Sequence, residues 1–162
     1  MTEQRIRAAR REDGAGFLRL VDELARFERL EPPGAQARKR LLDDAFGPRP
    51  AFELFVAEAS GELVAYAIVL RTYSSFLARP TLFLEDLYVV PDHRGTGLAH
   101  AMMRHLADLA LARGWGRLEG LVLGWNDRAR RFYAKTGAKE LDEWKVFRYD
   151  ETALRALAGA NP

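Results

Sequence analysis

The sequence predicts a mixed α/β fold (α+β) built as one layered domain. Some segments carry apolar residues at helical spacing, whereas others carry alternating or continuous apolar runs typical of strands, and the two kinds follow one another along the chain. Glycine or proline stands at the end of most of these segments. With 162 residues, the chain can bury a core without disulfides or metals to help. We therefore expect a single domain over residues 1–162.

The first half of the chain is expected to contain two helices and three strands. One face of the first helix repeats every three or four residues, through Phe17, Leu20, Val21, Leu24 and Phe27. Pro32-Pro33-Gly34 ends this helix, and Ser60-Gly61 between two apolar runs indicates a hairpin. The expected elements are a strand at 6–8, a helix from about 13, a helix at 35–46, and strands at 52–59 and 62–71.

The second half alternates strands and helices. The expected elements are strands at 82–90, 118–123 and 146–149, a helix at about 97–113, a helix after Asn126 that Gly137 ends, and a C-terminal helix. The run at 82–90 is apolar on both faces, as in a central strand. Glu85 and Asp86 interrupt it, and burying a carboxylate in a central strand is costly unless it is paired or lines a polar cleft.

Composition excludes several classes of function. A net charge of only +2 does not favour nucleic acid as a partner. The longest apolar run, Leu63 to Leu70, is far shorter than the ~20 residues of a membrane span, and the N-terminus lacks a signal-peptide core, so we expect a cytoplasmic protein with no membrane contact. The chain has no cysteine, which removes disulfides, thiolate metal sites and a cysteine nucleophile. We expect no metal.

The segment 94–99, Arg-Gly-Thr-Gly-Leu-Ala, places glycine-rich backbone between a buried strand and a helix. Unpaired N–H groups at a helix N-terminus and the helix dipole attract anions, and glycine lets a phosphate approach closely. Arg94 adds a forked donor beside the loop. A glycine turn that merely connects strand to helix is the structural alternative.

Two other nucleotide sites fit this segment or its surroundings poorly. In a dinucleotide-binding fingerprint the third glycine would fall on His100, and Glu119 stands too early in its strand to be the ribose-binding acid. A P-loop ending at Lys135-Thr136 would need glycines where Ala129 and Ala134 stand. A dehydrogenase or a P-loop enzyme is therefore disfavoured.

Two motif blocks together resemble the GNAT family of acetyl-CoA-dependent N-acetyltransferases. The first is Arg-x-x-Gly-x-Ala at 94–99, after a strand, and the second is Asn-x-x-Ala-x-x-Phe-Tyr-x-x-x-Gly-Ala at 126–138. Residues 83–89, 125–126 and 144–147 further resemble the diamine (spermidine/spermine) acetyltransferases and their thialysine-acetylating relatives. The resemblance implies a single N-acetyltransferase domain with a twisted, mostly antiparallel central sheet of about six to seven strands and helices on both faces.

The resemblance also implies how acetyl-CoA, the cosubstrate, would be held. Backbone groups of Leu87 and Val89 would pair with the pantetheine amides like an added strand, and the loop would surround the pyrophosphate. Ala99 takes a position that is often glycine, and alanine is an accepted variant. The implied coenzyme A contacts are Leu87, Val89, Arg94, Gly95, Thr96, Gly97, Leu98, Ala99, Asn126, Ala129 and Tyr133.

Transfer of an acetyl group to an amine needs a neutral amine, a polarised thioester carbonyl and a proton for the departing thiolate. By resemblance, Glu85 would accept the amine proton through water, a backbone N–H near Val89 would polarise the carbonyl, and Tyr133 would act as general acid. The alternatives are a salt bridge of Glu85 with an arginine and a purely packing role for Tyr133. Adjacent strand residues point to opposite faces, so Glu85 and Asp86 are not expected to form a dyad. The absence of cysteine favours direct attack in a ternary complex.

The acceptor is expected to be a primary amine of a small molecule: a diamine, a polyamine or a thialysine-like amine. The residues that the resemblance assigns to the substrate are Phe27, Glu28, Phe76, Glu85, Asp86 and Trp144. Ser74 and Ser75 stand where the polyamine enzymes bring an acidic side chain, which favours a shorter amine. The resemblance also implies a homodimer. A non-catalytic CoA-binding sensor and an acetyltransferase for a protein or peptide amine remain as alternatives.

Overall fold

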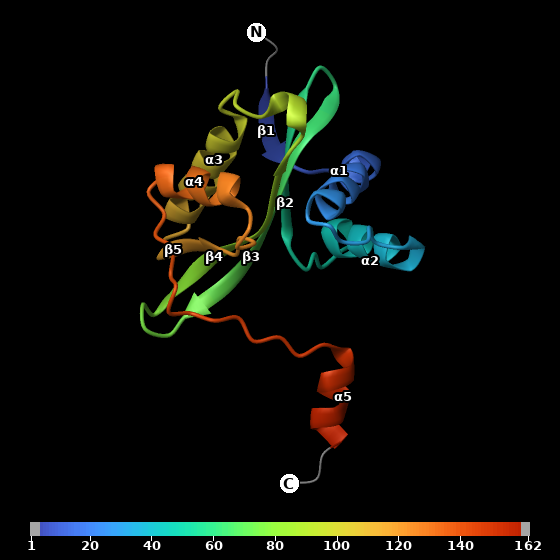
Figure 1. Cartoon of the computed structure of the whole chain (residues 1–162). Helices are drawn as coiled ribbons and strands as arrows, with labels where there is room; N and C mark the ends of the chain where they lie inside the picture. Colours follow the sequence, from blue (N-terminus) through green and yellow to red (C-terminus); the bar gives the residue numbers. More distant parts are fainter. Residues whose placement is uncertain (1–3, 160–162) are drawn as a thin grey trace. The chain divides into compact units, whose positions relative to one another are not determined.

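The computed structural model describes residues 4–159, which form two compact units, one ending at Leu121 and the other beginning at Val122. The first unit holds a five-stranded sheet in the order β1-β2-β3-β4-β5 (Figure 1). Neighbouring strands are antiparallel except for the parallel pair β4 and β5. The strands are β1 (Arg5–Ala8), β2 (Glu53–Ala59), β3 (Glu62–Ser74), β4 (Arg79–Val89) and β5 (Arg117–Gly120). This confirms the mixed α/β fold with a mostly antiparallel sheet.

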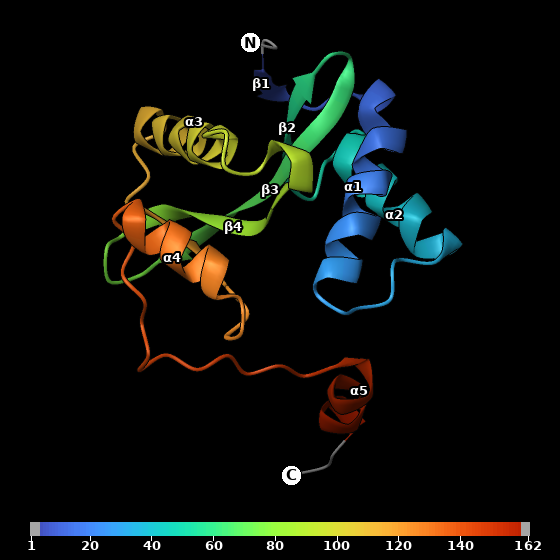
Figure 2. The same cartoon turned by 45° about the horizontal axis from the view of Figure 1, so that its top comes forward.

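Helices cover both faces of this sheet, as Figure 2 shows: α1 (Gly14–Phe27) and α2 (Ala35–Phe46) lie on one face and α3 (Leu98–Ala112) on the other. Side chains of β2 alternate between the two faces of the sheet. Leu54 and Val56 join the core under α1, whereas Phe55 packs against His105 of α3, with ring centroids 5.2 Å apart. Two 3-10 turns, η1 (Arg11–Asp13) and η2 (Pro91–His93), precede α1 and the glycine loop.

The hairpin between β2 and β3 turns at the predicted residues, where Ser60 and Gly61 have φ angles of 53° and 82°. The two strands of the next hairpin extend closer to its turn than predicted. β3 continues to Ser74 instead of ending at Arg71, and β4 begins at Arg79 instead of Leu82. All three residues from Arg71 to Tyr73 are exposed there, so backbone pairing continues without an apolar pattern to reveal it.

The second unit contains α4 (Asp127–Lys135) and α5 (Glu151–Gly159). Asn126 caps α4 by accepting a 3.1 Å hydrogen bond from the Ala129 N–H, and Gly137, with φ 94°, follows its end, as predicted. The predicted strand at 146–149 is wrong: these residues pair with no strand among the described residues. The strand count is therefore five, not six to seven. A strand requires a hydrogen-bonded neighbour as well as a strand-like composition.

No helix in the described part of the chain is both long enough and apolar enough to cross a membrane.

Candidate active site

The C-terminal half of β4 has an open edge. β5 pairs with β4 only from Thr81 to Leu84, and residues 86–89 have a strand partner on the β3 side alone among residues 4–159. Backbone groups on the other side can therefore pair with an extended ligand in the manner of an added strand. This geometry fits the predicted contacts of Leu87 and Val89 with a pantetheine arm.

A β-bulge lies at Glu85. Ile68 of β3 pairs with Asp86 and Val69 pairs with Leu84, so that Glu85 has no partner in β3. Such bulges re-aim side chains and break the alternation of a strand. The expectation that Glu85 and Asp86 point to opposite faces assumed a regular strand, and the bulge means that this alternation cannot be used to place Glu85. Asp86, being in register with the core residue Ile68, lies on the α1 face, while Glu85 is exposed.

The glycine loop leads into the N-terminus of α3. Gly95 and Gly97 have φ angles of 80° and 90°, a left-handed backbone conformation that favours glycine. No side chain in the described chain caps α3, so its first N–H groups are available to an anion. The hydroxyl of Thr96 donates a 2.8 Å hydrogen bond to the His93 carbonyl, which holds the loop in shape. This backbone is compatible with an anion site, and the binding of a pyrophosphate here stays a prediction.

Arg94 ties this loop to the rest of the first unit. Its Nε donates a 2.8 Å hydrogen bond to the Val89 carbonyl. Its guanidinium lies 5.3 Å from the ring centroid of Phe27 and 5.4 Å from that of Tyr88. The Val89 carbonyl thus already has one partner on the protein. Donation from Arg94 to a pyrophosphate stays a prediction.

Carboxylates gather near the middle of β4. Asp86 is half-buried and accepts a 3.1 Å hydrogen bond from the Tyr66 hydroxyl. Burial raises the pKa of Asp86 to about 6; the Tyr66 hydrogen bond opposes that rise, and the charges of Glu85 and Glu28 add to it. Burial also raises the pKa of Glu28. Two carboxylates, Glu85 and Glu28, thus act on the charge of a third, Asp86, and this concentration of negative charge is suited to a cation.

Sequence reasoning missed three residues of this region. They are Tyr66, Tyr88 and Glu23. Tyr66 lies inside an apolar run, and the hydroxyl of the buried Tyr88 donates a 3.1 Å hydrogen bond to Glu23. A usable signal was present, because a buried tyrosine normally needs a partner for its hydroxyl. That signal does not identify the partner, which depends on the strand register.

The structure brings together only some of the predicted substrate residues. Phe27 and Glu28, at the end of α1, lie near Arg94 and Asp86 through the contacts just described. Phe76 is 98% exposed at the tip of the hairpin between β3 and β4. Seven residues of strand separate Arg79 from Asp86, or about 23 Å. Phe76 of the same chain therefore does not border the carboxylates.

The second unit carries the remaining predicted cofactor contacts on α4. Asn126 is the N-cap of this helix, and Ala129 and Tyr133, four residues apart, lie along one side of it. Tyr133 is half-buried and its ring packs against Phe132 at 5.2 Å. Burial raises the pKa of Tyr133 to about 12, which keeps the hydroxyl protonated at neutral pH. Trp144 is 72% exposed.

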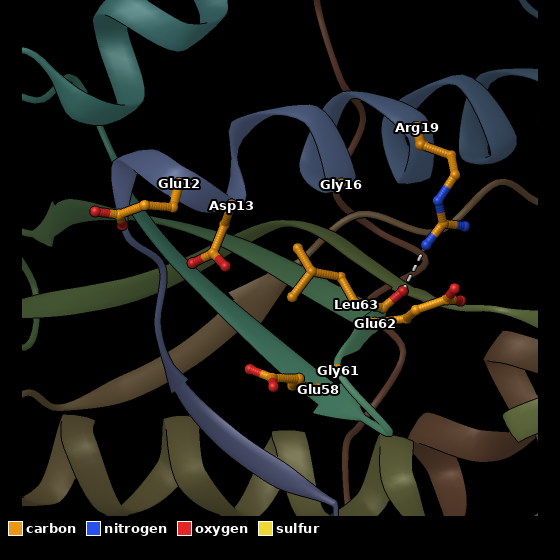
Figure 3. Close-up of a pocket in the computed structure, with 8 residues that line it drawn as sticks. All are labelled: Glu12, Asp13, Gly16, Arg19, Glu58, Gly61, Glu62 and Leu63. Atoms are coloured by element: carbon orange, nitrogen blue, oxygen red, sulfur yellow. Dashed lines mark hydrogen bonds between the residues drawn. The ribbon is translucent and has the colours of Figure 1, made fainter.

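A pocket elsewhere in the first unit contains none of the predicted site residues (Figure 3). It has a volume of about 520 Å³ and is lined by Glu12, Asp13, Gly16, Arg19, Glu58, Gly61, Glu62 and Leu63. Arg7 forms salt bridges with Asp13 at 2.7 Å and with Glu58 at 2.8 Å, so two of the acidic residues that line the pocket are already paired. No group of three or more His, Cys, Asp or Glu within residues 4–159 is arranged to hold a metal ion.

Uncapped N–H groups at a helix N-terminus, next to a half-strand with an open edge, are suited to a class of protein that binds a phosphorylated cofactor with an extended arm. The acetyltransferase (GNAT) family profile matches residues 18–138, and the chain belongs to this family. GNAT acetyltransferases use acetyl-CoA, and the chain is an N-acetyltransferase that transfers an acyl group to amines.

Named relatives cover almost the whole chain. A thialysine N-epsilon-acetyltransferase of Mus musculus is 36% identical over 170 residues, covering 98% of this chain and 99% of the relative. A spermidine/spermine N(1)-acetyltransferase-like protein 1 of Homo sapiens is 32% identical and covers 94% of this chain and 23% of the relative. Among solved structures, an integron cassette protein from V. cholerae matches with a TM-score of 0.85 at 21% identity, covering 99% of both chains, which supports the fold.

Proposed function

We propose that the chain transfers the acetyl group of acetyl-CoA directly to a primary amine of a small cationic molecule within a ternary complex. The observation that carries this proposal is the group of three carboxylates, Glu28, Glu85 and Asp86, on and beside the half of β4 whose edge is open. An amine that is a cation in water is drawn to carboxylates, and the open edge offers a place for the acetyl donor next to them.

The donor is proposed to be held by the residues that the resemblance to the family implies. The loop from Arg94 to Ala99 would bind the pyrophosphate, and the backbone of Leu87 and Val89 would bind the pantetheine arm. By the same resemblance, Asn126, Ala129 and Tyr133 would flank the arm. The bound donor would supply an activated acetyl thioester. The family profile spans the boundary between the units, which supports treating residues 1–162 as one acetyltransferase domain.

Two side chains are proposed to move protons. Glu85, exposed at the bulge, would accept the proton of the amine through water. Tyr133 would donate its proton to the departing sulfur, and its raised pKa supports this role because the hydroxyl still holds the proton at neutral pH. A backbone N–H near Val89 would polarise the thioester carbonyl.

The acceptor is proposed to be a diamine, a polyamine or a thialysine-like amine. The names of the relatives support this class. Phe27, Glu28, Asp86 and Trp144 would contact the amine and its methylene chain. Ser74 and Ser75 lie at the same hairpin as Phe76, so within one chain they do not select the length of an amine at the carboxylates.

The test is a screen for amine-dependent release of free thiol from acetyl-CoA. Thialysine, lysine, short diamines, spermidine and a lysine-containing peptide are compared at equal concentration. We expect kcat/KM at least about tenfold higher for one of the small amines than for the peptide, because each charge pair with a carboxylate contributes on the order of 1 kcal/mol or more. A higher kcat/KM for the peptide would favour a protein acceptor. Binding of acetyl-CoA with no thiol release by any amine would favour the sensor function.

A homodimer is also proposed. Five large apolar or aromatic side chains between residues 141 and 149 are at least half exposed, namely Leu141, Trp144, Val146, Phe147 and Tyr149. Large apolar side chains exposed together in one short segment support an interaction site there. In analytical ultracentrifugation we expect a species of twice the 18.3 kDa chain mass at micromolar concentration, and a monomer for Phe147→Asp. A monomeric wild-type chain with full activity would contradict the dimer. The cytoplasmic location stays a prediction.

A further inference from the structure

We infer that Tyr66 is a positioning residue for the proposed site: its hydroxyl holds the Asp86 carboxylate in place and in its charged form, ready to pair with the ammonium group of the amine. This inference rests on the proposed function for the role of Asp86. It assigns to β3 a part in the reaction that neither the motifs nor the fold family indicates.

The geometry of the pair is well defined. Tyr66 is fully buried in the middle of β3, and its Cα is in register with that of Tyr88 on β4. Asp86 is in register with Ile68, two residues farther along β3, so the side chains of Tyr66 and Asp86 share the α1 face. The hydroxyl reaches the Oδ2 atom of Asp86 at 3.1 Å.

Packing fixes the tyrosine ring. Phe17 of α1 meets the Tyr66 ring edge-on, with centroids 5.3 Å apart and planes at 76°. Tyr88 lies on the next strand with its centroid 6.4 Å away. A ring held between a helix and a neighbouring strand has little rotamer freedom, so its hydroxyl stays at one position. The carboxylate that accepts from it is fixed in turn.

The charge of Asp86 needs this support. Burial and the charges of Glu85 and Glu28 favour the neutral acid, and the hydrogen bond from Tyr66 favours the anion. Three described residues act on the charge of Asp86, namely Tyr66, Glu85 and Glu28, and none of them is a cation. The elements around the pair carry further titratable groups, which are Arg19, Asp22, Glu23 and Arg26 on α1, Arg29 after it, Arg38, Lys39, Arg40, Asp43 and Asp44 on α2, Tyr88 on β4, and Arg94. The ammonium of the amine would supply the missing positive charge.

The direction of the pH effect follows. With a pKa of about 6, Asp86 is charged at neutral pH and becomes neutral as the pH falls through that value. Neutral Asp86 no longer attracts an ammonium group, so kcat/KM for the amine is expected to fall on the acid side. Without the Tyr66 hydroxyl the pKa of Asp86 rises further, because the interaction that favours its anion is lost.

The experiment compares Tyr66→Phe with the unmodified chain over the pH range in which Asp86 titrates. We expect the acid limb of kcat/KM for the amine to move up by about one pH unit, which makes the variant about fivefold slower near pH 6 and nearly equal well above pH 8. The KM for acetyl-CoA should change little. Tyr73→Phe is the matched control, because Tyr73 lies on the same strand and is 60% exposed, and its acid limb should not move.

Two further measurements separate this inference from the proposed function and from misfolding. Carboxyl carbon NMR of Asp86 follows the same titration in the free protein, where the pKa should be higher in Tyr66→Phe whether or not any amine is acetylated. In Asp86→Asn, which keeps Tyr66, the acid limb assigned to Asp86 should disappear. The inference is overturned by a folded Tyr66→Phe protein whose acid limb and Asp86 titration stay in place, by an equal shift in Tyr73→Phe, or by a titration step near pH 6 that persists in Asp86→Asn.

Discussion

Tyr133→Phe is expected to lower kcat by about 100- to 1,000-fold, the range in which a general acid contributes, while acetyl-CoA affinity changes less than about threefold. The substitution removes only the hydroxyl and keeps the ring that packs against Phe132. Burial raises the pKa of Tyr133 to about 12, so the wild-type hydroxyl carries a proton under assay conditions and can pass it to the departing thiolate. The loss should therefore appear in turnover and not in binding.

Single-turnover kinetics and calorimetric titration with acetyl-CoA separate these two effects. Tyr73→Phe is the control, because Tyr73 is 60% exposed and has no proposed role, and its loss of a hydroxyl should leave kcat unchanged within about twofold. Unchanged turnover in Tyr133→Phe would remove this residue from the mechanism. A large loss of acetyl-CoA affinity would instead assign it to cofactor binding.

Glu85→Gln is expected to lower kcat/KM for the amine by about 100-fold near neutral pH, because general-base catalysis typically contributes at least that factor. Glutamine keeps the shape of the side chain but cannot accept the proton of the amine. Below the pKa of the amine, activity should then depend on the small fraction that is already neutral, so the rise of the rate toward alkaline pH should shift or flatten. The measurement is kcat/KM for one amine as a function of pH.

Glu62→Gln is the matched control, because Glu62 is an exposed glutamate on the adjacent strand β3. It should leave both the rate and the pH profile in place. An unaltered profile in Glu85→Gln would argue for another proton acceptor. Asp86 would be the first to consider, since it lies next along β4 and is half-buried.

Local signals were sufficient for many of the elements. The helix at 35–46 has the bounds of α2 because Gly34 and Gly47-Pro48 stop it on both sides. The hairpin at Ser60-Gly61 was predictable since only a left-handed backbone closes so short a turn. The glycine loop before α3 was predictable for the same reason, as Gly95 and Gly97 adopt φ angles that other residues disfavour.

Pairing between distant residues was not predictable in this way. The bulge at Glu85 is a mismatch in register between β3 and β4, which neither strand reveals alone. The hydrogen bond from Tyr66 to Asp86 joins residues 20 positions apart and depends on that register. The segment at 146–149 has a strand-like sequence but no strand partner among the described residues, and so it forms no strand.

By itself, the amino-acid sequence determined the class of fold, the glycine loop before α3 and the acetyltransferase family, because backbone conformation and motif spacing are local properties of a chain. The tertiary structure alone decided where the edge of β4 opens, which carboxylate is half-buried and which tyrosine holds it. The physical reason is that hydrogen-bond register and burial belong to pairs of strands and to packed layers, and a single segment does not contain its partner.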